Sequence, residues 1–316
     1  MTLDVLCCGI VVADFICEPV AHLPRAGELV LTGGISWEIG GCAANVATGL
    51  ARLGVPVGVV GRVGEDDAGR FVRSRLDARG VRTELVLDTP DEQTSSTLVV
   101  NVTGEDRRFV HTFGANRRFD GSEVPADFAG ARVLYLGGFF LMPTLRAERV
   151  AALFAAARQA GVLTVLDVVI ADAAGTWPAL QQVLPHTDVF LPNHDEAVLV
   201  TGLTDPQEQA ERFAQAGAGT VVITLGATGA LLRTPAGWWR SGVFPVPFVD
   251  GTGSGDAFAA GYIQGLLEQA PPTRCVEMGA ALGARCVMQP GATSGVMTRE
   301  ELATFLEQHR LSITPV

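Results

Sequence analysis

The sequence predicts an α/β protein with a mainly parallel central sheet and a small additional β-sheet. Strand-sized apolar runs alternate with helical segments through most of the 316 residues, as they do in βαβ units. Glycine-rich turns follow several of these strands and open the helices after them. The order is broken where Thr94–Val102 and Arg107–Phe113 flank the turn Thr103–Asp106, which predicts a β-hairpin.

The amino-terminal part begins with an apolar run that predicts a buried strand, Leu3–Val12. A turn separates this strand from Leu29–Trp37, which predicts an exposed strand or a hairpin. Gly40–Gly54 predicts a glycine turn and a small-residue helix, which stops at its last glycine because glycine readily adopts the left-handed conformation. The next predicted elements are the strand Val57–Val63, the helix Arg70–Arg79 and the strand Thr83–Leu87.

Strands and helices alternate regularly from residue 133 onward. The strands are short apolar runs, and glycine, proline or acidic residues mark where the helices begin. The predicted strands are Val133–Leu136, Val162–Leu166, Val189–Leu191, Thr220–Leu225 and Ala230–Arg233. The predicted helices are Thr144–Ala160, Trp177–Leu184, Ala197–Thr201, Pro206–Ala216, Ala257–Gln269, Arg274–Met288 and Arg299–Arg310.

The hairpin and the exposed strand before it predict a lid. We expect one domain over residues 1–316, with lid segments at about 12–38 and 92–115. A small sheet inserted near a binding site is typical of a segment that closes over a substrate. A homodimer formed through this lid is also expected.

Composition and charge exclude several classes of function. Hydrophobic residues make up 48% of the chain, yet no apolar run reaches the length of a membrane span. A net charge of −11 and the lack of a basic patch argue against nucleic-acid binding. The six cysteines lie in apolar segments without metal-ligand spacing, and no signal-peptide pattern follows Met1. We therefore expect a cytoplasmic protein with reduced cysteines.

The chain contains no lysine, because all 23 basic residues are arginine. A Walker-A lysine, a protein-kinase strand lysine and Schiff-base catalysis are therefore excluded. Any phosphate must be held by backbone N–H groups, arginine, hydroxyl groups or a metal ion.

The glycine turn Gly251–Gly255 is the strongest candidate site. Its glycines allow successive N–H groups to point into one space at the start of a helix, which is a favourable place for phosphate. Asp256 follows in the first helical turn, where its carboxylate would be repelled by a bound anion. We therefore expect Asp256 to take a proton from an attacking hydroxyl group. The alternative is that Asp256 is only a helix N-cap.

Two polar residues near the amino terminus are candidates for binding a substrate. Asp14 follows the predicted strand Leu3–Val12, and ligands of α/β sheets gather beyond the carboxyl ends of strands. Asn45 lies in the first turn of the glycine-opened helix and can bind a pair of hydroxyl groups. The alternative for Asp14 is an ordinary loop aspartate.

Asn193 and Glu196 stand three residues apart after the predicted strand Val189–Leu191. This spacing suits water-mediated contact to magnesium and phosphate. It equally suits a helix N-cap with a capping-box glutamate, the interpretation that the pattern alone favours. Thr224 and Gly226 mark another strand end where a phosphate could rest.

These motifs together resemble the ribokinase-like, or PfkB, family of carbohydrate and nucleoside kinases. Gly40–Gly54, with the following Gly61–Gly69, is similar to the amino-terminal signature of that family. Asp250–Phe258 is similar to its carboxy-terminal signature, which is the more specific of the two. Asn193 with Glu196, and Thr224–Gly229, match the motifs between them. The resemblance covers nearly the whole chain.

The resemblance implies a three-layer αβα sandwich with a β-sheet lid and ATP-dependent phosphorylation of a hydroxymethyl group on a small sugar or sugar derivative. It implies Asp256 as general base, Mg²⁺ as cofactor, and a monovalent cation, K⁺, in many relatives. The remaining implied roles are an anion hole at Gly253, Ser254 and Gly255; substrate binding at Asp14, Gly41 and Asn45; nucleotide and magnesium binding at Asn193, Glu196, Thr224, Gly226 and Gly229, with Glu196 reaching magnesium through water; and the monovalent cation at Asp250, Thr252 and Gly291.

Departures from the family pattern leave the acceptor undetermined. Val12 stands where many members carry asparagine, Cys42 replaces a lysine common in ribose-type members, and Asp167 lacks the Asp-x-Asn-x-Arg continuation. A nucleoside kinase and a non-catalytic sugar- or nucleotide-binding regulator of the same fold are therefore the alternatives. A dinucleotide-dependent oxidoreductase is disfavoured because no G-x-G-x-x-G follows the first strand.

Overall fold

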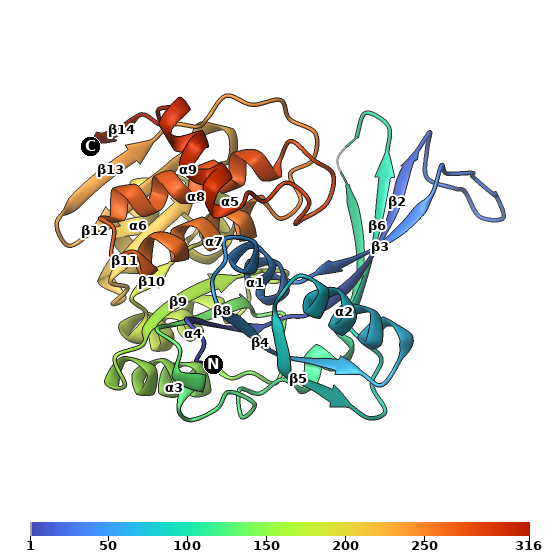
Figure 1. Ribbon diagram of the computed structural model, residues 1–316, viewed down its shortest axis with the longest axis horizontal. Helices are drawn as coiled ribbons and strands as arrows, with labels where there is room; N and C mark the ends of the chain where they lie inside the picture. The colour runs from blue at the N-terminus through green and yellow to red at the C-terminus, as the bar shows by residue number, and fades with distance from the viewer. Residues whose placement is uncertain (1, 106) are drawn as a thin grey trace.

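A computed structural model describes residues 2–105 and 107–316. Its ten-stranded central sheet is parallel from β5 to β11 and antiparallel from β11 to β14. Helices cover both faces, which confirms the expected αβα sandwich (Figure 1). The strands, in spatial order, are β14 (Ile313–Pro315), β13 (Gly237–Ser241), β12 (Ala230–Thr234), β11 (Thr220–Thr224), β10 (Val189–Phe190), β9 (Leu163–Val168), β8 (Val133–Phe139), β1 (Val5–Gly9), β4 (Val57–Gly64) and β5 (Arg82–Thr89).

Alternate residues of the central strands enter two separate hydrophobic cores. In β1, Val5 and Cys7 join the core under one helical layer, whereas Leu6 and Cys8 join the other. Successive side chains of a strand point to opposite faces, so a continuous apolar run serves both layers. The first layer holds α1 (Cys42–Arg52), α2 (Asp67–Ala78), α7 (Ser254–Leu267), α8 (Pro272–Cys286) and α9 (Arg299–Gln308), and the second holds α3 (Ala147–Gln159), α4 (Thr176–Val183), α5 (His194–Thr201) and α6 (Pro206–Gln215).

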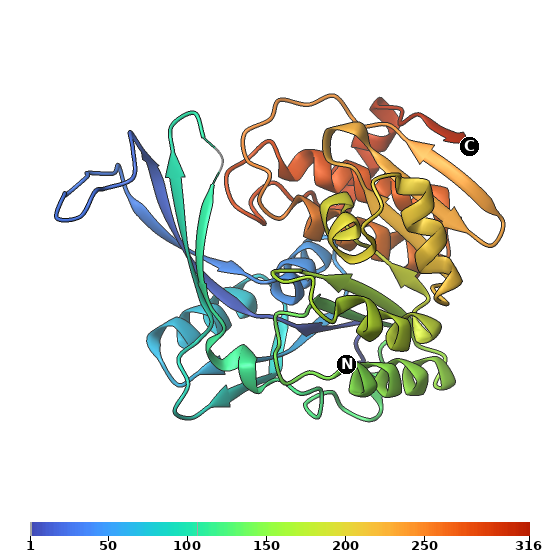
Figure 2. The ribbon, with the colours of Figure 1, turned by 180° about the vertical axis from the view of Figure 1, so that it is seen from behind.

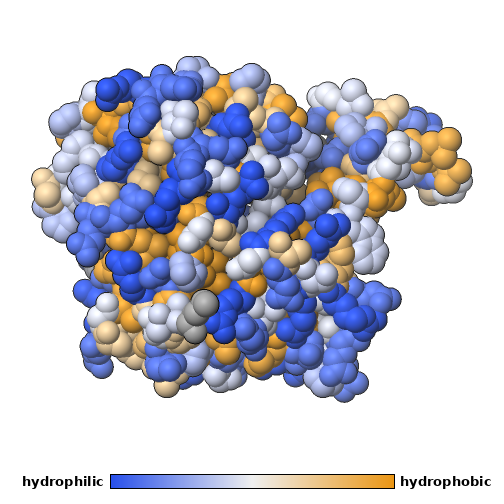
Figure 3. Space-filling view, in the orientation of Figure 1, coloured by the Kyte–Doolittle hydropathy of each residue, from blue (hydrophilic) through white to orange (hydrophobic). Residues whose placement is uncertain are grey.

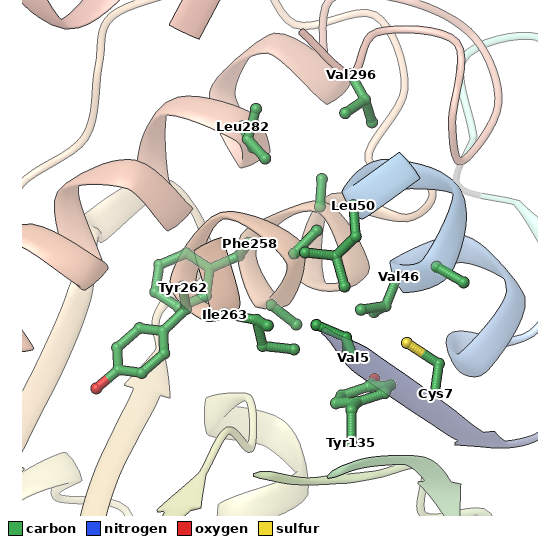
Figure 4. Close-up of a cluster of buried hydrophobic side chains, with 14 of the residues drawn as sticks. Val5, Cys7, Val46, Leu50, Tyr135, Phe258, Tyr262, Ile263, Leu282 and Val296 are labelled. Atoms are coloured by element: carbon green, nitrogen blue, oxygen red, sulfur yellow. The ribbon is translucent and has the colours of Figure 1, made fainter. Parts of the chain in front are cut away.

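The helices α1 and α7 pack directly against each other over β1. Figure 4 shows Val46 and Leu50 of α1 beside α7, close to Val5. Small residues allow this approach, since a Cβ added at Gly49 would lie 2.9 Å from Ala260 Cβ. This packing brings the beginnings of two helices that are far apart in sequence to one place.

A second sheet of four strands projects from one side of the molecule (Figure 2). Its inner strands, β2 and β6, are parallel, and the outer pairs are antiparallel. The predicted hairpin is confirmed as β6 and β7, and we call the whole four-stranded sheet the arm. Its strands, in spatial order, are β3 (Ile35–Gly40), β2 (Val12–Val20), β6 (Ser96–Val102) and β7 (Arg108–Thr112).

The predicted strand Leu3–Val12 is wrong in extent, because the chain changes sheet within it. Strand β1 ends at Gly9, whose φ of +134° disfavours other residues and whose added Cβ would lie 2.0 Å from Gly137 O. The fully buried Asn116 then binds both backbone groups of Val11, at 3.3 Å to its N–H nitrogen and 3.1 Å to its oxygen. Asp14 therefore lies inside β2 of the arm and not at the end of a central strand.

The remaining predicted elements are present with shifted ends, apart from two differences. The predicted strand Leu29–Trp37 begins only at Ile35, and Leu29 and Leu31 are 84% and 83% exposed in the loop before it. Strands β13 and β14 were not predicted; β13 pairs with the preceding strand β12, and the pairing of β14 with β13 is a long-range contact. Short helices complete the fold: η1 (Gly114–Arg118), η2 (Phe128–Gly130), η3 (Leu184–His186) and η4 (Gly226–Thr228). Within the part of the chain that the structure describes, no helix is both long and apolar enough to cross a membrane.

Candidate active site

Side chains from the carboxyl ends of the central strands, from the beginnings of α1 and α7, and from the arm interact with one another. Asp256 stands at the centre of this arrangement. It is the third residue of α7, whose N-cap is Gly253 with φ of +73° and no side-chain capping bond. The interpretation of Asp256 as the N-cap is therefore wrong. Its Oδ2 instead accepts a 2.8 Å hydrogen bond from Asn45 Nδ2 at the beginning of α1.

Burial and hydrogen bonding act on the pKa of Asp256 in opposite directions. Burial raises this pKa above its ordinary value, and the hydrogen bonds from Asn45 and Cys42 offset part of the increase. A carboxylate with a raised pKa is a stronger base, and so it is better suited to take a proton near neutral pH.

Gly253 is required by its close neighbours as well as by its backbone angle. A Cβ at this position would lie 2.5 Å from both Cα and O of Ala292. An added Cβ at Gly255 would meet no atom within 4 Å, so the backbone there faces open space. Ser254 N donates a long 3.3 Å bond to Gly251 O.

Asp167 is a half-buried carboxylate that sequence reasoning noted only as a departure. It lies at the end of β9, and Tyr135 OH donates a 2.7 Å hydrogen bond to its Oδ2. Ligand atoms of Asp167, Asp256 and Cys42 all lie within 4.8 Å of one another. Burial raises the pKa of Asp167 well above its usual range, and the charges of Glu196 and Asp256 raise it further. The available signal was its place at a strand end of an α/β sheet.

Asn193 and Glu196 form the capping box of α5, as the spacing favoured. Asn193 Oδ1 accepts from Glu196 N, and Glu196 Oε2 accepts from Asn193 N, both at 2.9 Å. Burial, with the charge of Asp256, raises the pKa of Glu196 to about 7, although hydrogen bonds from Asn193 oppose the shift. A parallel bridge also joins Asn193 to Thr224 at the end of β11. The cap thus joins the carboxylate of Glu196, whose pKa is raised, to Asn193, which is bridged to the carboxyl end of β11.

The turn after β11 contains two glycines in different surroundings. Gly226 has a φ of +56°, and an added Cβ would meet no atom within 4 Å. Gly229 has a φ of +99°, and an added Cβ would lie 2.0 Å from Ser241 O. Close backbone approach therefore explains Gly229, whereas Gly226 borders open space at the strand end.

Asp14 reaches the site from the arm. It lies opposite Glu38 in β3 and Thr97 in β6. Gly40 leaves room for it, because a Cβ there would lie 2.0 Å from Asp14 Oδ2. Burial raises the pKa of Asp14 to about 6; the Thr97 hydrogen bond lowers it, and the charges of Asp256 and Glu38 raise it.

Sequence reasoning did not assign Thr97 and His111 to the site. Thr97 Oγ1 lies 3.0 Å from His111 Nδ1 in β7, so a chain of polar contacts runs from Asp14 across the arm. Burial lowers the pKa of His111, which favours its neutral form at pH 7.

Asn45 carries an unsatisfied acceptor that points to a ligand. Only 7% of the residue is exposed, and its Oδ1 is a buried atom without a hydrogen-bond partner among the described residues. Buried polar atoms of this kind are rare, and a ligand is one explanation for them. Gly41 precedes α1 as its N-cap and has a φ of +89°. No side chain fits there, because an added Cβ would lie 2.4 Å from Ile10 O.

Asp250, Thr252 and Gly291 also come together. Asp250 Oδ1 accepts from Thr252 N at 2.9 Å and from Thr252 Oγ1 at 2.7 Å, and Oδ2 accepts from Gly291 N at 2.8 Å. Arg107 of the arm adds a cation that the sequence did not place here. Its Nη1 lies 2.7 Å from Asp250 Oδ1.

Comparison with known proteins identifies the family that the chain matches. Residues 2–299 match the family model described as pfkB family carbohydrate kinase. The chain is 32% identical to 2-dehydro-3-deoxygluconokinase of Bacillus subtilis over 86% of its length and 87% of that protein. It is equally 32% identical to aminoimidazole riboside kinase of Salmonella typhimurium, over 86% of its length and 89% of that protein.

A solved structure of Arabidopsis thaliana ribokinase complexed with ribose and ATP shares the fold. Its TM-score is 0.84 at 24% identity, covering 97% of this chain and 99% of that one. The two relatives at equal identity act on different acceptors, so overall similarity does not select the acceptor of this chain.

Proposed function

The chain belongs to the pfkB family of carbohydrate kinases, and we propose that it transfers the γ-phosphoryl group of ATP to a hydroxymethyl group of a neutral sugar. The observation that carries this proposal is the position of Asp256. A carboxylate of raised pKa lies in the first turn of α7, beside a glycine turn in which Gly255 is exposed, and is held by Asn45. A protein that only bound a sugar or nucleotide would have no use for such a base.

Asp256 would accept the proton of the attacking hydroxyl group as its oxygen approaches phosphorus. Backbone N–H groups of Gly253, Ser254 and Gly255 would stabilise the negative charge that develops, at typically ~3 kcal/mol for each donor. Ser254 would exchange its long bond to Gly251 for one to a phosphoryl oxygen.

ATP and Mg²⁺ fit the polar residues at the ends of β10 and β11. Mg²⁺ takes hard oxygen ligands, which carboxylates and water supply. Glu196 would hold the ion through water, with Asn193 beside it, and Asp167 adds a second acidic side chain whose pKa is raised. Magnesium would neutralise charge on the phosphates when bound. Nucleotide would lie against Thr224 and Gly226, the latter bordering open space.

The acceptor would bind Asp14, Gly41 and Asn45. The unsatisfied Asn45 Oδ1 and the carboxylate of Asp14 are hydrogen-bond acceptors, so they favour a ligand that presents several hydroxyl groups. The charges acting on Asp14 are those of Asp256 and Glu38, which would repel an acidic sugar. A nucleoside is the second candidate, because His111 of β7 and Phe113, which follows the strand, form an edge-to-face pair with centroids 5.7 Å apart.

Two further parts of the proposal concern ions and assembly. Asp250, Thr252 and Gly291 are the residues that would hold a monovalent cation such as K⁺, and the Arg107 guanidinium already binds the Asp250 carboxylate that such an ion would need. A second copy of the chain would cover the outer face of the arm, where Leu98 and Val110 are paired and exposed. We place the reaction in the cytoplasm.

Release of ADP from ATP and magnesium tests the function across a panel of neutral sugars, matched sugar acids and nucleosides. We expect stimulation by a neutral sugar and little by its acid. No stimulation by any acceptor would contradict the kinase proposal, whereas a preference for a sugar acid or nucleoside would contradict only the acceptor class.

A further inference from the structure

Arg107 connects the arm to the loops that carry the glycine turn. Its side chain is 26% exposed, and its guanidinium contacts both the Asp250 carboxylate and the Thr252 hydroxyl group. A Cβ at Gly251 would lie 3.4 Å from Arg107 Nη2, so the guanidinium lies against the turn itself. Figures 1 and 2 both show the side of the hairpin where β7 begins facing the loops that precede α7 and follow α8.

Asp250 joins three segments through one carboxylate. Donors from the turn, from the loop after α8 and from the arm all bind its two oxygens, at 2.7–2.9 Å. Burial raises the pKa of Asp250, but the hydrogen bonds from Gly291 and Thr252 and the charge of Arg107 outweigh burial and lower it overall. The carboxylate is therefore ionised near neutral pH and needs a compensating positive charge.

We propose that Arg107 is the built-in counter-ion of Asp250, which fixes the glycine turn and holds the arm closed over the site without a bound monovalent cation. Arg107 is thus a positioning residue, since it acts on the turn through Asp250 and Thr252. This inference deepens the proposed kinase function and rests on it for its activity readout.

The proposal predicts that K⁺ and the guanidinium substitute for each other. An arginine holds a carboxylate through charge-assisted hydrogen bonds, so a monovalent cation has little to add while Arg107 is present. Removing the guanidinium leaves a partly buried carboxylate without its counter-ion. A cation from solution can then take that place, provided that Asp250, Thr252 and Gly291 remain together.

Arg107→Gln tests this, and Arg108→Gln is the matched control. Arg108 follows directly in the hairpin but pairs with Glu105. Both variants and the wild type are assayed in potassium, sodium and tetramethylammonium salts at matched ionic strength. We expect the wild type and Arg108→Gln to vary within about two-fold, and Arg107→Gln to lose ~10-fold in kcat in tetramethylammonium and recover in potassium.

Hydrogen–deuterium exchange without substrate gives a readout that does not depend on activity. Arg107→Gln should exchange faster at residues 107–112 and 250–254, potassium should slow exchange at 250–254, and Arg108→Gln should match the wild type. Strong potassium activation of the wild type would overturn the proposal, as would equal exchange in the two variants. If no acceptor supports turnover, the kinase proposal fails and the exchange result alone decides the role of Arg107.

Discussion

Asp256 and Asp14 are carboxylates whose pKa values are raised for the same first reason, burial in a site already rich in negative charge. Their expected roles differ because their contacts differ. Asp256 stands at the start of α7 and is bound by Asn45, whereas Asp14 lies on the arm and is bound by Thr97. Asp256 is therefore suited to take a proton from the acceptor substrate, and Asp14 is suited to hold that substrate in place.

Asp256→Asn should fold and lose kcat by ~10²–10⁴-fold, the usual contribution of a general base. Nucleotide affinity should stay nearly unchanged, and the melting temperature at pH 8 should not fall, because ionised Asp256 is disfavoured by burial. Steady-state kinetics, nucleotide titration and thermal melting check these outcomes. Asp195→Asn, an exposed neighbour of Glu196, is the control. Near wild-type turnover of Asp256→Asn would remove the base assignment.

Asp14→Ala should lose at least ~10²-fold in kcat/KM for the true acceptor, because the paired hydrogen bonds are lost. Slow ATP hydrolysis without acceptor should be nearly unchanged. A parallel loss of both activities and of thermal stability would instead make Asp14 a structural residue.

The pH dependence of acceptor binding should follow the pKa of Asp14, about 6. Protonation removes the negative charge of the Asp14 carboxylate, which accepts hydrogen bonds from the substrate. The KM for the substrate that receives the phosphoryl group should therefore rise as pH falls below about 6, and Asp14→Asn should lack this rise. The effect on stability has the opposite sign. The pKa in the folded protein is raised, so this group's contribution is complete below the unfolded pKa of about 3.9 and is lost as pH rises through the folded value. A KM that is independent of pH in the wild type would contradict the assignment.

Single elements of this fold serve structure and site at once. The capping box of α5 satisfies backbone N–H groups and also fixes Glu196 to Asn193, which is bridged to Thr224. An equivalent box, Thr298 with Glu301, opens α9. Comparing substitutions in the two boxes therefore separates the stability lost with a helix cap from any role of Glu196 in magnesium binding.

Glu196→Gln should keep the cap, since an amide oxygen can accept from Asn193 N, but should weaken the response to magnesium by ~10–100-fold through the lost charge. Glu196→Ala should also lower thermal stability by about 1 kcal/mol, as loss of a cap does. The magnesium response of Glu301→Gln should equal that of the wild type. Magnesium titrations of initial rate and thermal melting check these outcomes. An unchanged magnesium response in Glu196→Gln would limit Glu196 to capping.

At the scale of the molecule, the arm carries hydrophobic residues that the body does not cover (Figure 3). Leu98 and Val110 lie opposite each other in β6 and β7, 43% and 66% exposed. They follow Thr97 and precede His111, so strand alternation turns them away from the site face. A dimer covering this outer face would leave the active site open.

Leu98→Asp combined with Val110→Asp should convert the expected homodimer to a monomer, because buried carboxylates would face each other in the interface. Leu199→Asp is the control, since Leu199 is 50% exposed on α5. Light scattering after size-exclusion chromatography measures the masses. A wild-type chain that is monomeric at micromolar concentration would remove the dimer proposal.

The sequence alone determined the α/β alternation, the hairpin of the arm, the glycine turn before Asp256 and the capping position of Asn193. These features depend on neighbours in sequence: periodicity, turn residues and helix caps act over a few positions. The resemblance to a family added expected roles for the site residues. Among these residues, Asp250, Thr252 and Gly291 come together in the structure.

Only the tertiary structure decided where these pieces meet. It moved Asp14 from a central strand to the arm, because Gly9 and Asn116 turn the chain there. It joined Asn45 to Asp256 across 211 positions and Arg107 to Asp250 across 143, and no local pattern encodes such contacts. It also brought Asp167 beside Asp256. The pKa values and the counter-ion follow from this packing, since burial and neighbouring charge exist only once the chain is folded.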